Sequence, residues 1–265
     1  MSQNLSLEKF PKSEIRNLAY MLDPSTWARQ CLGFRPDPWQ ADLLNSSSNR
    51  IILNCSRQTG KSTTVAILAC HRAIFYPGSL ILMISPSLRQ SGELFIKFSQ
   101  MLDLLPKVPE RTEDQKLSTT FKTGSRVVSL PSSESTIRGF SAVSLLIEDE
   151  ASWVPDDLWI ATRPMLAVSG GSHILMSTPR GKRGHFYETW EKGGPEWEKI
   201  KITADQCPRI SKEFLEEEFA IMGPIKFSQE YKCEFVNDEF TVFTEELLEK
   251  MNQQSEDDEV NIFDY

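Results

Sequence analysis

A short apolar run, a polar loop and a helical stretch follow one another between residues 50 and 75. This order constrains the fold more than any other feature of the chain. Residues 50–54 are rich in isoleucine and leucine, which predicts a buried strand, and residues 61–75 carry apolar side chains at helical spacing. Between them lies the sequence Cys55-Ser-Arg-Gln-Thr-Gly-Lys-Ser62. A strand, a loop and a helix in this order indicate an α/β fold.

The loop contains the residue types that bind a triphosphate. Gly60 lets backbone amides face the phosphates, and Lys61 supplies a cation to the β and γ oxygens. Ser62 offers its hydroxyl to Mg²⁺ at the start of a helix, where the helix dipole favours anions. Cys55 stands where the usual pattern has its first glycine, and a polar turn that caps a helix is the alternative. The position between a predicted strand and a predicted helix favours the phosphate-binding loop.

The alternation of strands and helices continues along the chain. Strands are predicted at 79–85, 117–121, 126–130, 144–148, 173–177, 197–203 and 232–236, and helices at 88–105, 156–168, 184–192, 211–221 and 225–231. Several of these strands are apolar throughout and do not alternate. The sequence therefore predicts a mostly parallel sheet with helices on both faces.

Length and composition suit one α/β domain with an appendage. We expect an N-terminal helical segment at 1–40, a core at 41–205, a helical segment at 206–237 and an acidic tail at 238–265. Most of the net charge of -8 lies in residues 244–265, so the remainder is nearly neutral, which excludes a protein that coats nucleic acid through bulk positive charge. No apolar run approaches the roughly 20 residues of a membrane span. Scattered cysteines without a CxxC pair argue against a disulfide scaffold or a zinc site.

Acidic side chains follow the predicted strand at 144–148. Asp149 and Glu150 come at its carboxyl end, which is where ligands bind in open α/β sheets. A nucleotide hydrolase needs one carboxylate to hold hydrated Mg²⁺ and another to orient and polarise the attacking water. Glu148 directly precedes this pair, so the division of roles among the acids stays open, and a solvated cluster that caps a helix is the alternative.

The motifs occur in an order that resembles one known family. They are Pro36-Asp-Pro-Trp-Gln40, Ser56 to Ser62, Arg138-Gly139, Leu145 to Ala151 and Met176-Ser-Thr-Pro-Arg-Gly181. This order is similar to the ATPase half of the large terminase subunit of tailed double-stranded-DNA bacteriophages, over roughly residues 20 to 245. The resemblance implies a RecA/ASCE-like P-loop NTPase with a small helical lid at 206–237. It also implies ATP hydrolysis coupled to the packaging of double-stranded DNA.

The resemblance also implies roles for individual residues. Gln40 matches the glutamine that reads the adenine. Glu150 matches the catalytic glutamate, and Asp149 and Ser62 match the Mg²⁺ ligands. The loop around the phosphates comprises Ser56, Arg57, Gln58, Thr59, Gly60, Lys61, Ser62 and Thr63.

Three further matches concern the transition state and the coupling of hydrolysis to movement. Arg57 matches an arginine proposed to stabilise the γ-phosphate. Arg138 matches one that reaches a neighbouring subunit's site, although an arginine paired with Glu134 or Glu148 is an equal alternative. Ser177 and Thr178 match the coupling segment, which would otherwise be read as a Ser-Thr-Pro turn.

The expected cofactors are ATP and Mg²⁺. The expected partners are double-stranded DNA, further copies of the chain in a ring on the capsid portal, and the small terminase subunit, in the cytoplasm of an infected bacterium. Full-length relatives carry a nuclease domain, for which residues 237–265 are too short, so nuclease activity is not expected from this chain alone. Asp257, Asp258 and Asp264 fit a solvated tail.

Two other functions stay open from the sequence. A superfamily 2-like helicase would need a second RecA-like domain, for which the chain has no room. A non-hydrolysing nucleotide-binding assembly protein would not need the acids at Asp149 and Glu150.

Overall fold

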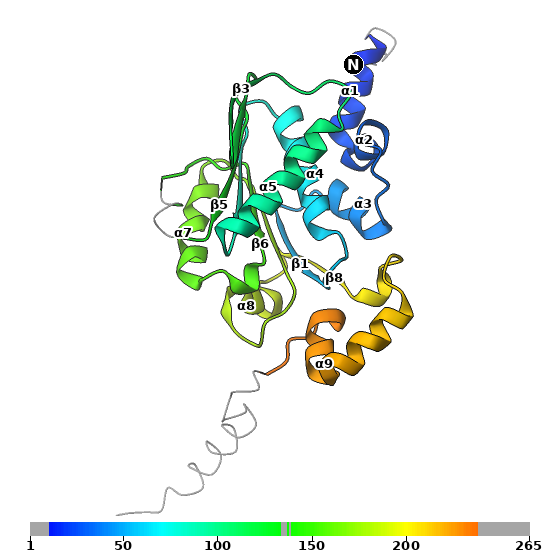
Figure 1. The fold of residues 1–265 in the computed structure, drawn as a ribbon. Helices are drawn as coiled ribbons and strands as arrows, with labels where there is room; N and C mark the ends of the chain where they lie inside the picture. The colour runs from blue at the N-terminus through cyan, green and yellow to red at the C-terminus, as the bar shows by residue number, and fades with distance from the viewer. Residues whose placement is uncertain (1–10, 134–136, 138, 238–265) are drawn as a thin grey trace, which may run out of the picture.

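The computed structural model describes residues 11–133, 137 and 139–237 (Figure 1). Within these ranges, eight strands form one sheet in the order β3-β4-β5-β2-β6-β7-β1-β8. The neighbours from β5 to β8 pair in parallel, and only β3 and β4 run antiparallel to their neighbours. The predicted α/β fold with a mostly parallel sheet is confirmed.

Most elements lie close to their predicted bounds. The strands are β1 (Arg50–Cys55), β2 (Leu80–Ser85), β3 (Arg111–Gln115), β4 (Ser118–Phe121), β5 (Arg126–Pro131), β6 (Leu145–Asp149), β7 (Ser172–Ser177) and β8 (Glu198–Ile202). The α-helices are α1 (Lys12–Leu22), α2 (Pro24–Cys31), α3 (Pro38–Asn45), α4 (Lys61–Phe75), α5 (Leu88–Asp103), α7 (Asp156–Ala167), α8 (Gly184–Lys192) and α9 (Lys212–Lys232). Short 3-10 helices, η2 (Ala151–Trp153) and η3 (Ala204–Gln206), follow β6 and β8.

Helices cover both faces of the sheet because successive strand residues point to opposite sides. On one face Ile81 and Met83 of β2 pack in a cluster with residues of α2, α3, α4 and α5. On the other face Leu82 and Ile84 pack against α7. Leu175 of β7 packs with Phe186 of α8 on that same side. Figure 1 shows α4 and α5 on one side of the sheet and α7 and α8 on the other.

The C-terminal part of the described chain forms a helical unit beside the sheet. In α9 the φ of Gly223 is 74°, which breaks the helix at the point where the sequence predicts a gap between two helices. Phe227 and Tyr231 of α9 pack on Ala204 of η3. No helix in the described ranges is long and apolar enough to cross a membrane.

The strand predicted at 232–236 is wrong. α9 continues to Lys232, and Cys233 ends it in the left-handed conformation. The apolar alternation in this segment reflects side-chain burial instead of strand pairing. Cys233 is 1% exposed, and Phe235 contacts the rings of Phe186 and Tyr187. β3 was not predicted because its polar, mostly exposed residues carry no apolar pattern.

The core beneath the N-terminal helices contains a buried histidine that should make the fold sensitive to acid. His71 Nε2 lies 2.9 Å from the carbonyl oxygen of Tyr20, and burial lowers the pKa of His71 to about 4. Because this value is below the unfolded pKa of 6.5, the contribution to stability is present above pH 6.5 and is lost as the pH falls towards 4. We expect the free energy of unfolding to decrease by about 3 kcal/mol over that range from this group.

Denaturant titrations of the wild type and of His71→Gln at several pH values test this expectation. Glutamine can still donate a hydrogen bond to Tyr20 but does not titrate, so its stability should fall less steeply below pH 6.5. Equal pH slopes for the two proteins would contradict the assignment.

Candidate active site

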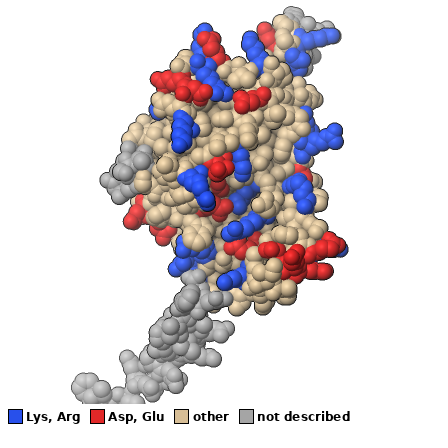
Figure 2. Space-filling view, in the orientation of Figure 1, with Lys and Arg blue, Asp and Glu red and all other residues tan. Residues whose placement is uncertain are grey.

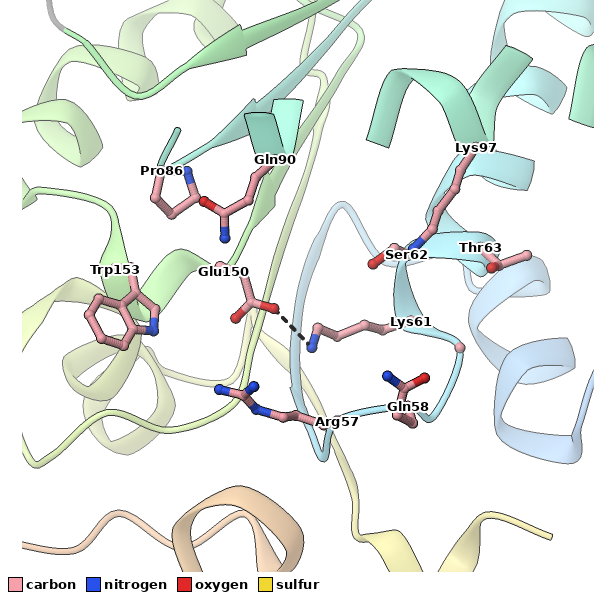
Figure 3. A pocket seen from close by; sticks show the side chains of 11 residues that line it. Arg57, Gln58, Lys61, Ser62, Thr63, Pro86, Gln90, Lys97, Glu150 and Trp153 are labelled. Atoms are coloured by element: carbon pink, nitrogen blue, oxygen red, sulfur yellow. Dashed lines mark ion pairs between the residues drawn. The ribbon is translucent and has the colours of Figure 1, made fainter. Parts of the chain in front are cut away.

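The phosphate loop and the acidic residues lie at the same edge of the sheet. The loop follows β1, and Asp149 and Glu150 lie at the end of β6; both strands pair in parallel with β7. A pocket of about 620 Å³ opens between these segments (Figure 3). Its lining comprises Arg57, Gln58, Gly60, Lys61, Ser62 and Thr63 of the loop, Pro86, Gln90 and Lys97, and Glu150 and Trp153 after β6.

An ion pair crosses this pocket. Lys61 Nζ lies 3.2 Å from Glu150 Oε1, and Figure 3 shows the two side chains pointing towards each other. Burial by itself would lower the pKa of Lys61, but the charges of Glu150 and Asp149 outweigh it and raise the pKa. Lys61 therefore stays protonated in a site where it is only 8% exposed.

Three residues around the pocket have left-handed backbone conformations. The φ of Gly60 is 92°, that of Gln58 is 62° and that of Glu150 is 51°. Glycine adopts this region freely, whereas a non-glycine residue costs roughly 1 to 3 kcal/mol there. At Gly60 a Cβ atom would also lie 2.8 Å from Gln40 Nε2, so a side chain there would require Gln40 to shift. The chain thus holds strain on both sides of the Lys61–Glu150 pair.

Asp149 is buried beside this pair and does not line the pocket. Its Oδ1 accepts a hydrogen bond from the Glu150 amide at 3.0 Å. Burial and the charge of Glu150 raise the pKa of Asp149 to about 6, against the lowering effect of Lys61. A further positive charge near Asp149 would favour its ionised form.

A chain of hydroxyl groups connects Glu150 with the segment after β7. Ser177 Oγ donates to Glu150 Oε2 at 3.3 Å and lies 2.6 Å from Ser152 Oγ. Ser152 Oγ also lies 2.9 Å from the carbonyl oxygen of Thr178, so the two hydroxyl hydrogens serve two of these three contacts at a time. The structure therefore brings the predicted catalytic acid and the predicted coupling segment into contact. Ser152 was missed by the sequence analysis, although it stands only two residues after Glu150.

Other predicted site residues lie around the pocket or behind it. Arg57 Nε is 2.5 Å from Glu230 Oε2 on α9, which ties the phosphate loop to the helical unit. Gln40 is buried, and its Oε1 accepts from the Asp37 amide at 2.9 Å in the capping box of α3. Ser56 and Thr59 are also buried, with the Thr59 hydroxyl donating to the Ser56 carbonyl. Arg138 and the acids of the tail lie outside the described residues.

Glu148 belongs to a separate buried network that the sequence analysis did not anticipate. Its carboxylate contacts His173 Nε2 at 2.8 Å and His185 Nε2 at 3.2 Å, and both imidazole rings stack on Trp159. Burial opposes ionisation, but the hydrogen bonds from the two histidines hold the pKa of Glu148 at about 2. His185 also contacts Asp156 Oδ1 at 3.2 Å. Glu148 is thus held by two histidines in the described part of the chain.

Comparison with known proteins identifies the family. A family model described as "Terminase large subunit, T4likevirus-type, N-terminal" matches residues 52–250. The chain belongs to this family. It is therefore a large-terminase ATPase domain of the kind that the motif order implied, and the helicase alternative is set aside.

Solved structures of large terminases share the fold. The ATPase domain from Thermus phage P74-26 is 24% identical, with a TM-score of 0.72 over 81% of this chain and 100% of that one. The large terminase of bacteriophage HK97 is 17% identical, with a TM-score of 0.61 over 89% of this chain and 51% of that one. The large terminase of a thermophilic bacteriophage, in complex with ATP-gamma-S, is 16% identical, with a TM-score of 0.59 over 82% and 52%. This chain spans about half the length of the latter two.

The Glu148 network should contribute strongly to stability. In Glu148→Ala the buried imidazoles of His173 and His185 lose their anionic partner. Removing one side of a buried charge pair typically costs about 3 to 5 kcal/mol, and we expect a decrease of this size in the free energy of unfolding. Denaturant titration at neutral pH measures it.

The matched control is Glu188→Ala on α8. Glu188 pairs with Lys192 at 3.0 Å on the surface, and an exposed pair of this kind contributes less than about 1 kcal/mol. Similar stability losses in the two variants would contradict the role of Glu148.

Proposed function

We propose that ATP hydrolysis in the pocket between the phosphate loop and the end of β6 drives the movement of double-stranded DNA during packaging. The observation that carries this proposal is the 3.2 Å ion pair between Lys61 and Glu150. A cation for the phosphates and a carboxylate for the attacking water must lie on opposite sides of one cleft in a nucleotide hydrolase. The ATP-gamma-S complex of the thermophilic phage's large terminase supports ATP as the nucleotide.

The loop residues would bind the triphosphate. Backbone amides from Gln58 to Thr63 and the dipole of α4 favour the phosphates, while the Lys61 ammonium neutralises the terminal oxygens. Arg57 lines the same pocket, and its guanidinium would stabilise the charge that develops on the γ-phosphate. Gln40 would contact the adenine through its side-chain amide, whose Oε1 accepts from the Asp37 backbone in this structure.

Ser62 and Asp149 fit a Mg²⁺ ion. Both supply oxygen atoms, which magnesium prefers, and a bound cation would offset the burial and the Glu150 charge that raise the pKa of Asp149. In the described ranges no cluster of three or more His, Cys, Asp or Glu could hold a metal ion, so substrate phosphates and water would have to complete the shell. When bound, the ion would neutralise charge on the β and γ oxygens.

Glu150 would orient and polarise the attacking water. Its second oxygen accepts from Ser177, so a change at the γ-phosphate that moves the Glu150 carboxylate also changes the hydrogen bonds of Ser177 and Ser152. Ser152 holds the backbone of Thr178. This contact supports the coupling role proposed for Ser177 and Thr178.

Replacement of Glu150 tests the proposed hydrolysis. Glu150→Gln keeps the shape of the side chain but removes its charge, and we expect kcat for ATP to fall by about 100-fold or more. Binding of ATP-gamma-S should not weaken, because the substitution removes a negative charge beside the phosphates. A steady-state phosphate-release assay measures the first effect and calorimetry the second.

The control for this experiment is Glu191→Gln, an exposed glutamate on α8. It should hydrolyse ATP at the wild-type rate. Wild-type turnover by Glu150→Gln would show that another group activates the water.

The DNA contact is proposed for the loop between β7 and α8. This loop follows the Ser177–Thr178 segment directly and carries Arg180, Lys182 and Arg183. The Arg180 guanidinium lies 3.4 Å from the ring centroid of Trp153, which lines the nucleotide pocket. By contrast, acidic side chains gather over α9 (Figure 2), from Glu213, Glu216, Glu217 and Glu218, and would repel a phosphate backbone.

The remaining partners follow from the family. We propose that copies of the chain form a ring on the capsid portal, with Arg138 reaching a neighbour's site, and that the small terminase subunit delivers the DNA. We also retain as proposals the cytoplasm of the infected host as the location and the segment boundaries at 40, 205 and 237.

Removal of the loop charges tests the DNA contact. In Lys182→Ala/Arg183→Ala we expect weaker binding to duplex DNA. The slope of the logarithm of the binding constant against the logarithm of the salt concentration should become less steep by about 0.9 for each lost phosphate contact. ATP hydrolysis without DNA should persist. Fluorescence anisotropy at several salt concentrations measures the slope, with Lys199→Ala on β8 as control. Unchanged slope and affinity would exclude this loop as the DNA contact.

A further inference from the structure

The phosphate loop is supported from behind by the segment that joins the sheet to α9. In such a loop the amides face the phosphates, so the carbonyl oxygens must turn away and find donors elsewhere. The carbonyl of Thr59 accepts from Arg209 Nη2 at 3.0 Å, and that of Gln58 accepts from Cys207 Sγ at 3.9 Å. At the start of the loop, the Ser56 amide donates to the Ile202 carbonyl at 2.9 Å.

Arg209 makes the strongest of these connections. Its Nη1 and Nη2 donate to the two carboxylate oxygens of Asp37 at 3.0 and 2.8 Å, while Nη2 also holds the Thr59 carbonyl. A two-pronged contact of this kind requires the planar fork of a guanidinium. Because the Asp37 amide donates to Gln40, one side chain connects the phosphate loop, the start of α3 and the segment that leads into α9.

The loop conformation at this contact needs external support. Gln58 and Gly60 flank Thr59 and both have positive φ values. The position that a Cβ of Gly60 would take lies 3.7 Å from Arg209 Nη2 and 2.8 Å from Gln40 Nε2, so both side chains pack directly behind the loop. Without the guanidinium, the Thr59 carbonyl would lose its charged donor and the peptide would be freer to turn towards the pocket. A carbonyl oxygen facing the pocket would repel a phosphate.

We propose that Arg209 is a positioning residue for ATP: it holds the Thr59 carbonyl away from the phosphates and fixes the phosphate loop against Asp37. This inference rests on the proposed function of the pocket. Arg209 acts on the binding of the triphosphate more than on the chemical step, because it contacts the loop and not Glu150. Its loss should therefore change KM and nucleotide affinity much more than kcat.

Steady-state kinetics and ATP-gamma-S calorimetry on a small set of variants test this. Arg209→Ala should raise KM for ATP and the Kd of ATP-gamma-S by about tenfold, as expected for the loss of hydrogen bonds to a charged group, with kcat within about threefold of wild type. Arg209→Lys should have nearly the same raised KM and Kd as Arg209→Ala, because an ammonium cannot bridge both oxygens of Asp37 and the Thr59 carbonyl. Lys212→Ala, which removes an exposed cation three residues further on, should behave as wild type.

Asp37→Ala provides a second route that leaves Arg209 in place. It should raise KM in the same direction by a smaller factor, and Arg209→Ala/Asp37→Ala should be no worse than Arg209→Ala alone, because both residues act in one assembly. Thermal unfolding of each variant shows whether it is folded. If Arg209→Ala does not fold, the KM values of Asp37→Ala and Arg209→Lys test the proposal instead: raised values support it, and wild-type values contradict it.

The outcomes separate this inference from the proposed function. A wild-type chain that binds no nucleotide or releases no phosphate contradicts the proposed function itself. A wild type that hydrolyses ATP, together with folded Arg209 variants whose KM and Kd are unchanged, overturns the role of Arg209. A fall in kcat at unchanged KM would also overturn it, because that result places Arg209 in the chemical step.

Discussion

The ion pair between Lys61 and Glu150 is the interaction on which the active site depends. It joins the loop after β1 to the end of β6, two segments that are far apart in the sequence and separated in the sheet by β7. The parallel register of these three strands places both segments at one edge. A lysine paired with Glu150 and close to the charge of Asp149 stays protonated although it is buried, so its positive charge is already present in the pocket before a nucleotide binds.

The same edge of the sheet carries several contacts that hold strained or buried groups in place. Gln58 and Glu150 have left-handed backbones, and Asp149 is buried with a raised pKa. Strain and desolvation of this kind persist only where surrounding contacts fix them. Here Ser177, at the end of β7, donates a hydrogen bond to Glu150. Arg209, in the segment before α9, donates one to the Thr59 carbonyl of the phosphate loop. The helical unit and the segment before it are therefore connected to the phosphate loop through Arg209, through Cys207 and through the Arg57–Glu230 pair.

The sequence was sufficient for the order of the elements and for the place of the pocket. Apolar strands and the change to helical spacing mark β1, β2, β6 and β7, because these strands are buried on both faces. The prediction from the sequence was wrong at 232–236, where Cys233 and Phe235 pack against the protein without forming a strand. β3 is polar and mostly exposed, so its sequence has no apolar pattern from which a strand could be predicted.

Contacts between distant side chains could not be predicted from local pattern. Glu148 stands beside the predicted catalytic acids in the sequence, but its side chain is buried away from the pocket, where it contacts His173 and His185. Arg209 lies in a polar segment that resembles an ordinary linker, and only the fold brings it to Asp37 and Thr59. The roles of such residues depend on partners that are 25 to 172 positions away in the chain.

The central claim is that one triphosphate binds between Lys61 and the carboxylates at the end of β6. Equilibrium binding of ATP-gamma-S to the wild type and to Lys61→Met tests this most directly. The account predicts that Lys61→Met weakens binding by at least about tenfold, because the substitution removes the cation and leaves two acids beside the phosphates. Equal affinities for the two proteins would show that the nucleotide binds elsewhere and would contradict the account.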